Sequence, residues 1–542
     1  MFWSLVSLLA GCVEHHVRPK TAAPEPSAIA YHAEDARHAA PAPKSAIPIA
    51  PCRQVAESTS PGEPEGIAQA AYSAEAPAAV SPESARATER SPSPQATPPG
   101  GPSTSLTLDL PTALALAQGQ NPRIALAQAR VAQAQAAYAA SRVLWLPSLR
   151  AGMNYNKHEG AIQDVAGQNI LASRGAAFGG LGAAAVGAGS PAVPGIVAQF
   201  HLADALYQRQ IAACALEAQR EEATAEANRQ LLETALAYLQ LLEAHQRLAI
   251  AAQTLAQGQE LARLTESFAQ AGAVAQADVD RAEAAVALLR TELARAEEAV
   301  GVASTHLAQQ LSVDPATTFL PAESTVVPLE LIPVAQPPAE LVAQGLSQRP
   351  ELAASRALVC QAVHRLRREQ SAVWLPSVAI GASYGAFAAG TGGQITHGDA
   401  RFDFDSAAWW EVRQLGLGER AAREGALAQI EQARWREVES LDRVAREIVE
   451  SLTQVQARQR QIAMAEEGIA AAQRSYQRNL ERIRHGQGLP LEALQAIQAL
   501  DAAQRDYLRA VIDYNAAQFR LVWALGWPVQ DVGSEHRQRP NS

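Results

Sequence analysis

The fold is decided by WLPSLRAGMNYN (145–156) and by its second occurrence in the chain, WLPSVAIGASYG (374–385). A helical pattern precedes each stretch, and its first turn carries a proline, Pro122 or Pro350, a residue that suits the first position of a helix. After each Trp-Leu-Pro-Ser the pattern changes to the alternation of a strand. The matching context on both sides predicts an internal two-fold repeat.

Each repeat is expected to contribute two strands. Apolar residues alternate with small or polar ones over about 148–157 and 195–203 in the first half, and over 377–387 and 400–406 in the second. A period of two is typical of a strand with one apolar face. The Gly/Ala-rich stretch around Gly180-Leu181-Gly182 is expected to be a surface loop between the first two strands. The chain therefore offers four amphipathic strands.

A long helical pattern without proline follows each pair of strands. The first runs from Asp204 to about Phe268. At about 1.5 Å per residue, some 60 helical residues reach about 90 Å, a length typical of coiled-coil packing. Each long helix is expected to reverse at a glycine, Gly272 or Gly486, and to return as a second helix. The fold class is thus mainly α with a small β part, built on long antiparallel helices.

The N-terminal residues have a different character. The chain opens with an apolar segment that ends in Ala10-Gly11-Cys12 and resembles the cleavage site of bacterial lipoproteins. We therefore expect Cys12 to be acylated, and a frayed terminus with an incidental cysteine is the alternative. The predicted divisions are a signal segment 1–12, a disordered Pro/Ala/Ser-rich tether 13–104, a first repeat 105–311, a linker 312–339, a second repeat 340–528 and a polar tail 529–542.

The composition argues against several classes of protein. Lys+Arg is 45 and Asp+Glu is 55, a net charge of -10, which is unlike a basic nucleic-acid binder. Four cysteines among 542 residues are too few for a disulfide scaffold. Cys214 and Cys360 fall in separate predicted helices and are expected to be small packing residues. We find no nucleotide, nucleophile or metal motif, so we expect no enzyme activity, no cofactor and no metal site.

Four strands are too few to close a barrel in a membrane, for which about eight is the smallest usual number. An open edge in lipid would leave backbone groups without hydrogen bonds. Three chains would supply twelve strands, and cyclic symmetry would close the ring. Tryptophans stand at the ends of the strands, as interface anchors do, although a core role is the alternative. The helix–strand junctions are marked by Trp145, Pro147, Trp374 and Pro376, and Trp409-Trp410 follow the last strand.

The order, spacing and duplication of these features resemble the TolC-like outer-membrane efflux protein family, from about Leu106 to Pro528. The resemblance implies a homotrimer with a twelve-stranded transmembrane β-barrel and a helical barrel. It also implies an outer-membrane channel that passively conducts substrate from an inner-membrane pump of the RND or ABC type. A periplasmic adaptor would join the two. The expected location is the outer membrane of a Gram-negative-type bacterium, with a lipid anchor and with helices projecting into the periplasm.

The same resemblance assigns the adaptor-docking tip to the two helix turns. The alternative is that these turns only reverse the chain. Carried to this sequence, the tip residues are Gly272, Ala273, Val274, Gly486, Gln487, Gly488, Leu489 and Pro490.

Two sets of charges could line the pore. Asp403 and Asp405 would share the polar face of the last strand. Arg478 and Arg482 share one helix face with Arg474, and they either form a cationic ring in the lumen or an ordinary solvated stripe. We favour the stripe. A lipid-anchored periplasmic coiled-coil scaffold without a pore is the alternative function.

Overall fold

The computed structural model describes residues 105–183, 192–333, 335–392, 394–485 and 487–527, all within one of the chain's two units, Ala78–Ser542. The predicted signal segment with Cys12, the tether, Gly486 and the polar tail lie outside the described residues. The described part is mainly helical with a small β part, as predicted. Among the described helices, no continuous stretch combines the length and the hydropathy of a transmembrane helix.

The two halves present their elements in the same order. The first half consists of α2 (Leu110–Gln120), α3 (Pro122–Arg142), β2 (Ser148–Leu149), β3 (Ala151–Gln163), β4 (Asn169–Ala183), β5 (Val193–Pro194), β6 (Ile196–His201), α4 (Leu202–Gln270) and α5 (Gln276–Leu311). The second half consists of α6 (Pro338–Gln348), α7 (Pro350–Ala372), β8 (Ser377–Thr391), β9 (His397–Trp409), a 3₁₀ turn (Arg413–Gly416), α8 (Leu417–Arg484) and α9 (Pro490–Ala524).

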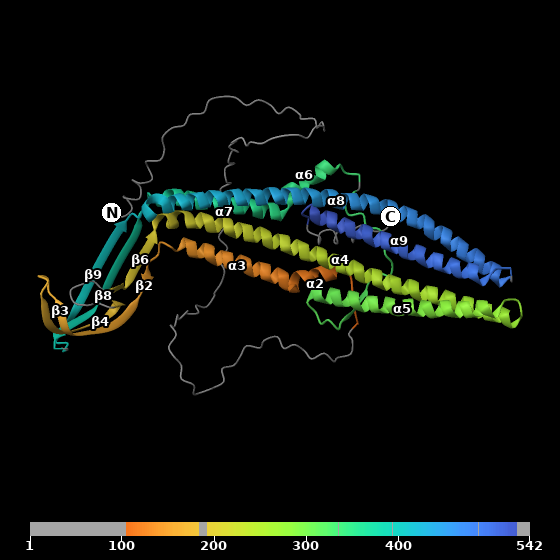
Figure 1. Cartoon of the computed structure of the whole chain (residues 1–542), viewed down its shortest axis with the longest axis horizontal. Coiled ribbons are helices and arrows are strands. Elements are labelled where there is room, and N and C mark those ends of the chain that lie inside the picture. The colour runs from red at the N-terminus through yellow and green to blue at the C-terminus, as the bar shows by residue number, and fades with distance from the viewer. Residues whose placement is uncertain (1–104, 184–191, 334, 393, 486, 528–542) are drawn as a thin grey trace, which may run out of the picture. The chain divides into compact units, whose positions relative to one another are not determined.

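The long helices form two antiparallel hairpins. Helix α4 has 69 residues and α8 has 68, so each is about 100 Å long. Helix α5 returns along the part of α4 that is far from the sheet, and α9 returns along α8 (Figure 1). The shorter helices α3 and α7 pack against the part of α4 that is near the sheet, and α7 also contacts α8. Two long helices thus serve as the supports on which the shorter helices pack.

The apolar core lies where the hairpins meet the short strands β1 (Ser105–Leu108) and β7 (Thr318–Pro321), which pair in parallel. Its fully buried members include Leu307, Phe319 and Val455. Tyr238 is also buried there, and its hydroxyl lies within hydrogen-bond distance of two acceptors, the Glu323 carboxylate and the backbone oxygen of Leu108. The two-stranded parallel sheet thereby contacts both the middle of α4 and the return helix α5.

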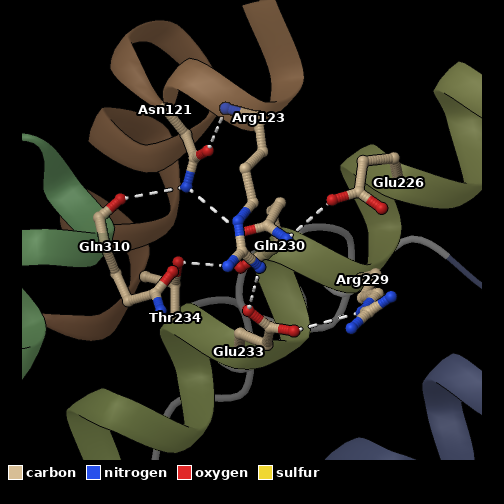
Figure 2. Close-up of polar contacts among 8 residues, drawn as sticks. All are labelled: Asn121, Arg123, Glu226, Arg229, Gln230, Glu233, Thr234 and Gln310. Carbon is tan, nitrogen blue, oxygen red and sulfur yellow. Dashed lines mark hydrogen bonds and ion pairs between the residues drawn. The ribbon is translucent and has the colours of Figure 1, made fainter. Parts of the chain in front are cut away.

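The break between α2 and α3 occurs at Asn121, as the Asn-Pro pair predicts. Figure 2 shows how this residue joins three helices. Its side-chain oxygen accepts from the backbone N–H of Arg123 at 2.9 Å, which caps α3. Its amide nitrogen donates to the backbone oxygen of Gln310 in α5 at 3.1 Å and to Gln230 in α4 at 3.4 Å. Gln230 is fully buried, so Asn121 both caps the start of α3 and holds this point of the chain against α4.

The seven strands β2–β6, β8 and β9 form one antiparallel sheet whose strands occupy four rows. Strands β4 and β6 both pair with the same edge of β8, and they follow each other along it: Leu181 lies opposite Tyr384, and Ile196 lies opposite Ala382. Strands β2 and β3 likewise follow each other beside β6 and β4. The rows are therefore β2 with β3, β4 with β6, β8, and β9 (Figure 1).

The expectation of a surface loop around Gly180-Leu181-Gly182 is wrong. This stretch is the end of β4, and the second row begins at Asn169 rather than near residue 195. Gly180 has φ of 153° and lies opposite Gly385, and a Cβ built on it would be 2.5 Å from the Gly385 Cα. Glycine is needed because the two backbones approach each other closely, so a composition typical of loops here serves a strand.

Candidate membrane face and helix-turn tip

One face of the sheet is apolar and exposed. One line of paired residues crosses the strands from Ala151 through Leu181 and Tyr384 to Phe402. A second line, parallel to it, crosses through Leu149, Ile196, Ala382 and Phe404. The residues of these two lines define the apolar face, and Met153 and Tyr155 continue it along β3.

The apolar face is exposed to an unusual degree for such large side chains. Met153 is 86% exposed, Leu149 73% and Phe402 67%. Burial alternates strictly along β3, so the intervening residues are the more covered ones. A contiguous exposed apolar surface marks a site of contact with a membrane or a partner. The exposed face of β3 is therefore apolar as far as Tyr155, and beyond it carries the exposed ion pair of Lys157 with Glu159 at 2.9 Å.

The opposite face carries the charges of β9. Arg401 and Asp403 form an ion pair at 2.8 Å, and both are largely buried. The Arg401 guanidinium also lies 4.8 Å from the centre of the Phe387 ring, a cation–π contact. Asp403 and Asp405 alternate with Phe402 and Phe404 along β9, so they belong to the polar face, as expected. Asp403 is paired within its own strand.

The two helix turns lie at the same end of the helices (Figure 1). A small apolar cluster joins them: Leu261 of α4, Ile483 of α8, and Ala493 and Ile497 of α9 are all buried. The first turn is closed by a hydrogen bond from the Ala273 N–H to the Phe268 oxygen at 2.9 Å. The cluster makes the two turns one surface, which we call the tip.

The tip exposes backbone and small side chains. Gly272 has φ of 75°, in the left-handed region that glycine favours, and nothing lies within 4 Å of the position that its Cβ would occupy. Ala273 and Gln487 are exposed, and Leu489 is 62% exposed. Val274 and Gly488 are partly buried, and Pro490 is buried as the first residue of α9. Arg482 spans the second turn through an ion pair with Glu492 at 2.9 Å.

Residues 341–527 match the family model of the outer membrane efflux proteins. This part of the chain is similar to the outer membrane efflux protein family. The match runs from α6 to the end of α9 and includes strands β8 and β9, the half of the chain in which the second Trp-Leu-Pro-Ser stands. A comparison with curated protein sequences finds no match.

Solved structures of outer-membrane channels have the same fold. The Campylobacter jejuni channel CmeC superposes with a TM-score of 0.66 at 16% identity, over 79% of this chain and 88% of that one. The Vibrio cholerae outer membrane protein VceC gives 0.63 at 18% identity, over 78% and 96%. The channel OprN gives 0.63 at 20% identity, over 78% and 90%. The predicted resemblance to the TolC-like outer-membrane efflux proteins is confirmed.

In this efflux-protein fold the junction tryptophans are exposed rather than part of the apolar core. Trp374 is 77% exposed, and its backbone oxygen accepts a hydrogen bond from the indole N–H of Trp410 at 3.2 Å. Trp145 is 47% exposed and meets the Phe200 ring edge-on at 5.1 Å. Helices α3 and α7 end at Arg142 and Ala372, and Pro147 and Pro376 stand directly before β2 and β8. The tryptophans therefore stand beside the sheet, and their role as interface anchors stays a prediction.

The arginines of α8 lie on the surface. Arg474 and Arg478 are exposed, and Arg482 is held by Glu492 and by the Gln487 backbone oxygen at 3.4 Å. Exposure in a single chain is compatible with the solvated stripe and with a cationic ring in the lumen, so the stripe stays a prediction.

The structure also brings together residues whose proximity the sequence did not predict. The Cys214 and Cys360 sulfur atoms lie 2.8 Å apart, although the two residues belong to different helices. Arg349, at the start of α7, is only 3% exposed and pairs with Glu351 at 2.9 Å and Glu447 at 3.0 Å. The sole sequence signal for Arg349 was its place before Pro350.

Proposed function

We propose that this protein is the outer-membrane channel of a tripartite efflux or secretion system, which conducts substrate passively from an inner-membrane pump and a periplasmic adaptor to the exterior. The observation that carries the proposal is the exposed apolar face across all four rows of the sheet. Burying such a face in water-excluding lipid is favourable, at about 25 cal/mol for each Å² removed from water. A scaffold that stays in the periplasm would have no use for this face.

The edges of the sheet support assembly into a homotrimer. Among the described strands, β9 pairs with β8 alone, and β3 pairs with β4 alone. Each of these edge strands has 13 residues. In lipid an unpaired edge is costly, so β9 of one chain would pair with β3 of the next. Three chains with four rows each would close a ring of twelve strands, with the apolar face outward and the polar face toward the lumen.

The energy for transport would come from the pump. The chain supplies a conduit, and the tip is the surface through which an adaptor would dock in the periplasm. Acylation of Cys12 would anchor the N-terminal side of the chain in the same outer membrane.

Replacing Gly272 with tryptophan is expected to abolish efflux while the oligomer still forms. The new side chain would project from the tip into open space, where it blocks docking without disturbing the core. The measurement is drug or metal resistance of cells that depend on the variant. Cross-linking of the oligomer in isolated outer membranes is measured in parallel.

Two controls separate docking from backbone strain. Gly272→Ala places a residue with a Cβ in the same left-handed conformation, which costs about 1–2 kcal/mol, but adds little bulk. This variant should retain most efflux. Gly301→Trp places the same bulk on α5, also in open space but away from the tip. Unimpaired efflux by the Gly272→Trp protein would contradict the docking role.

A further inference from the structure

Three side chains that bind metals well meet between α4 and α7. The side chains are Cys214 of α4, and Cys360 and His364, which stand one turn apart on α7. One ligand atom from each lies within 4.8 Å of the other two. The two sulfur atoms are the closest pair, at 2.8 Å. All three residues are partly buried.

The packing of the two helices fixes this meeting point. Helix α4 leaves the sheet where α7 arrives at it, so the helices run antiparallel. Tyr207 and Ser371 share a hydrogen bond at 3.0 Å, and Arg368 pairs with Asp204. Cys214 lies about 18 Å along α4 from its start, given the rise of a helix. The cluster is therefore part of a regular helix interface rather than of a loop.

The histidine has an unused ligand atom. His364 Nδ1 is buried and has no hydrogen-bond partner. A buried polar atom without a partner is unfavourable, and a bound ion would supply the missing partner. Burial and the nearby Arg367 lower the pKa of His364 below its usual value. The neutral imidazole is the form that binds a metal ion.

We propose that Cys214, Cys360 and His364 bind one thiophilic metal ion, Zn²⁺ or Cu⁺, that clamps α4 to α7. Two thiolates with one imidazole suit these ions, whereas Ca²⁺ and Mg²⁺ prefer oxygen ligands. Three protein ligands leave a further position for solvent or for a fourth ligand. The site is independent of the tip and of the apolar face, so it goes beyond the proposed channel function.

The geometry requires only small movements. Ligand atoms at about 2.0–2.3 Å from a tetrahedral ion lie about 3.3–3.8 Å from one another. The sulfur atoms would separate by about 1 Å and the imidazole would approach. A disulfide, with sulfur atoms about 2.05 Å apart, would require the opposite movement and would leave His364 Nδ1 without a partner.

The test is a titration of the full-length protein, purified in detergent, reduced and freed of metal. Co²⁺ serves as the spectroscopic probe for the Zn²⁺ site, and Cu⁺ is added in competition with a chromophoric chelator. We expect one ion per chain and a thiolate-to-cobalt charge-transfer band that Zn²⁺ removes. The substitutions Cys214→Ser and Cys360→Ser should abolish the band. His364→Gln should weaken binding by at least about 10–100-fold, the loss that removal of an outer-shell partner already causes.

Matched controls make the result specific. Cys52→Ser removes a thiol of the N-terminal Pro/Ala/Ser-rich stretch, and His306→Gln removes an exposed histidine of α5. Both should bind the ion as the unchanged protein does. Absence of stoichiometric binding by the reduced protein would overturn the proposal. Binding that survives Cys214→Ser would overturn it as well.

Discussion

A lysine in place of Met153 is expected to prevent the protein from assembling in the outer membrane. Met153 is 86% exposed on the apolar face, so the substitution disturbs no packing within the chain. A lysine on the lipid side of a barrel costs about 2–4 kcal/mol near the middle of the bilayer, and a trimer would contain three of them. The measurement is the amount of protein in outer-membrane fractions, together with cross-linking of the oligomer.

Asn156→Lys is the matched control. Asn156 stands three residues further along the same strand, on the opposite face, where the sheet is polar. A lysine there would meet water in the lumen, so assembly should be retained. Equal effects of the two lysines would contradict the assignment of the apolar face to lipid.

Replacing Arg349 with alanine is expected to destabilise the helical part by about 3–5 kcal/mol, the usual cost of breaking a buried ion pair by removing one partner. The side chain is 3% exposed and pairs with Glu351 and Glu447. Its guanidinium also lies 4.1 Å from the centre of the Trp523 ring and donates to the Ala524 backbone oxygen at 3.3 Å. Alanine would leave two carboxylates and the end of α9 without their donor. The midpoint of denaturant unfolding, measured in detergent, reports the change.

Arg356→Ala provides the comparison within the same helix. Arg356 pairs with Glu437 at 3.5 Å, but its side chain is 56% exposed. Exposed pairs contribute about 0–1 kcal/mol, so this variant should unfold close to the unchanged protein. If both alanine variants unfolded at the same denaturant concentration, the role given to Arg349 would be wrong.

The long helices could be predicted because few structures other than a helix share their sequence pattern. A stripe of apolar residues over some 60 positions without proline fits only a long helix, and α4 spans Leu202–Gln270 where 204 to about 268 was expected. Strand β4 could not be predicted, because a stretch rich in glycine and alanine is as typical of a loop as of a strand. Only the pairing partner shows that Gly180 must be glycine, since it lies against Gly385.

Some residues of the candidate sites could likewise be predicted from the sequence, and others could not. The glycine of the first turn could be predicted from the reversal of the helix, and its φ of 75° agrees. The Cys214, Cys360 and His364 cluster could not, because it depends on how two helices align over a sequence separation of 146 residues. Arg349 was missed for the same reason: Glu447 and Trp523 reach it from α8 and α9, and no local pattern indicates that contact.

The most direct test of the central claim is the conductance of the purified protein in a planar lipid bilayer. The proposed channel predicts a detergent-dependent trimer that gives discrete steps of current when it inserts. A monomer that stays soluble without detergent and gives no current would contradict the channel and would favour the lipid-anchored coiled-coil scaffold.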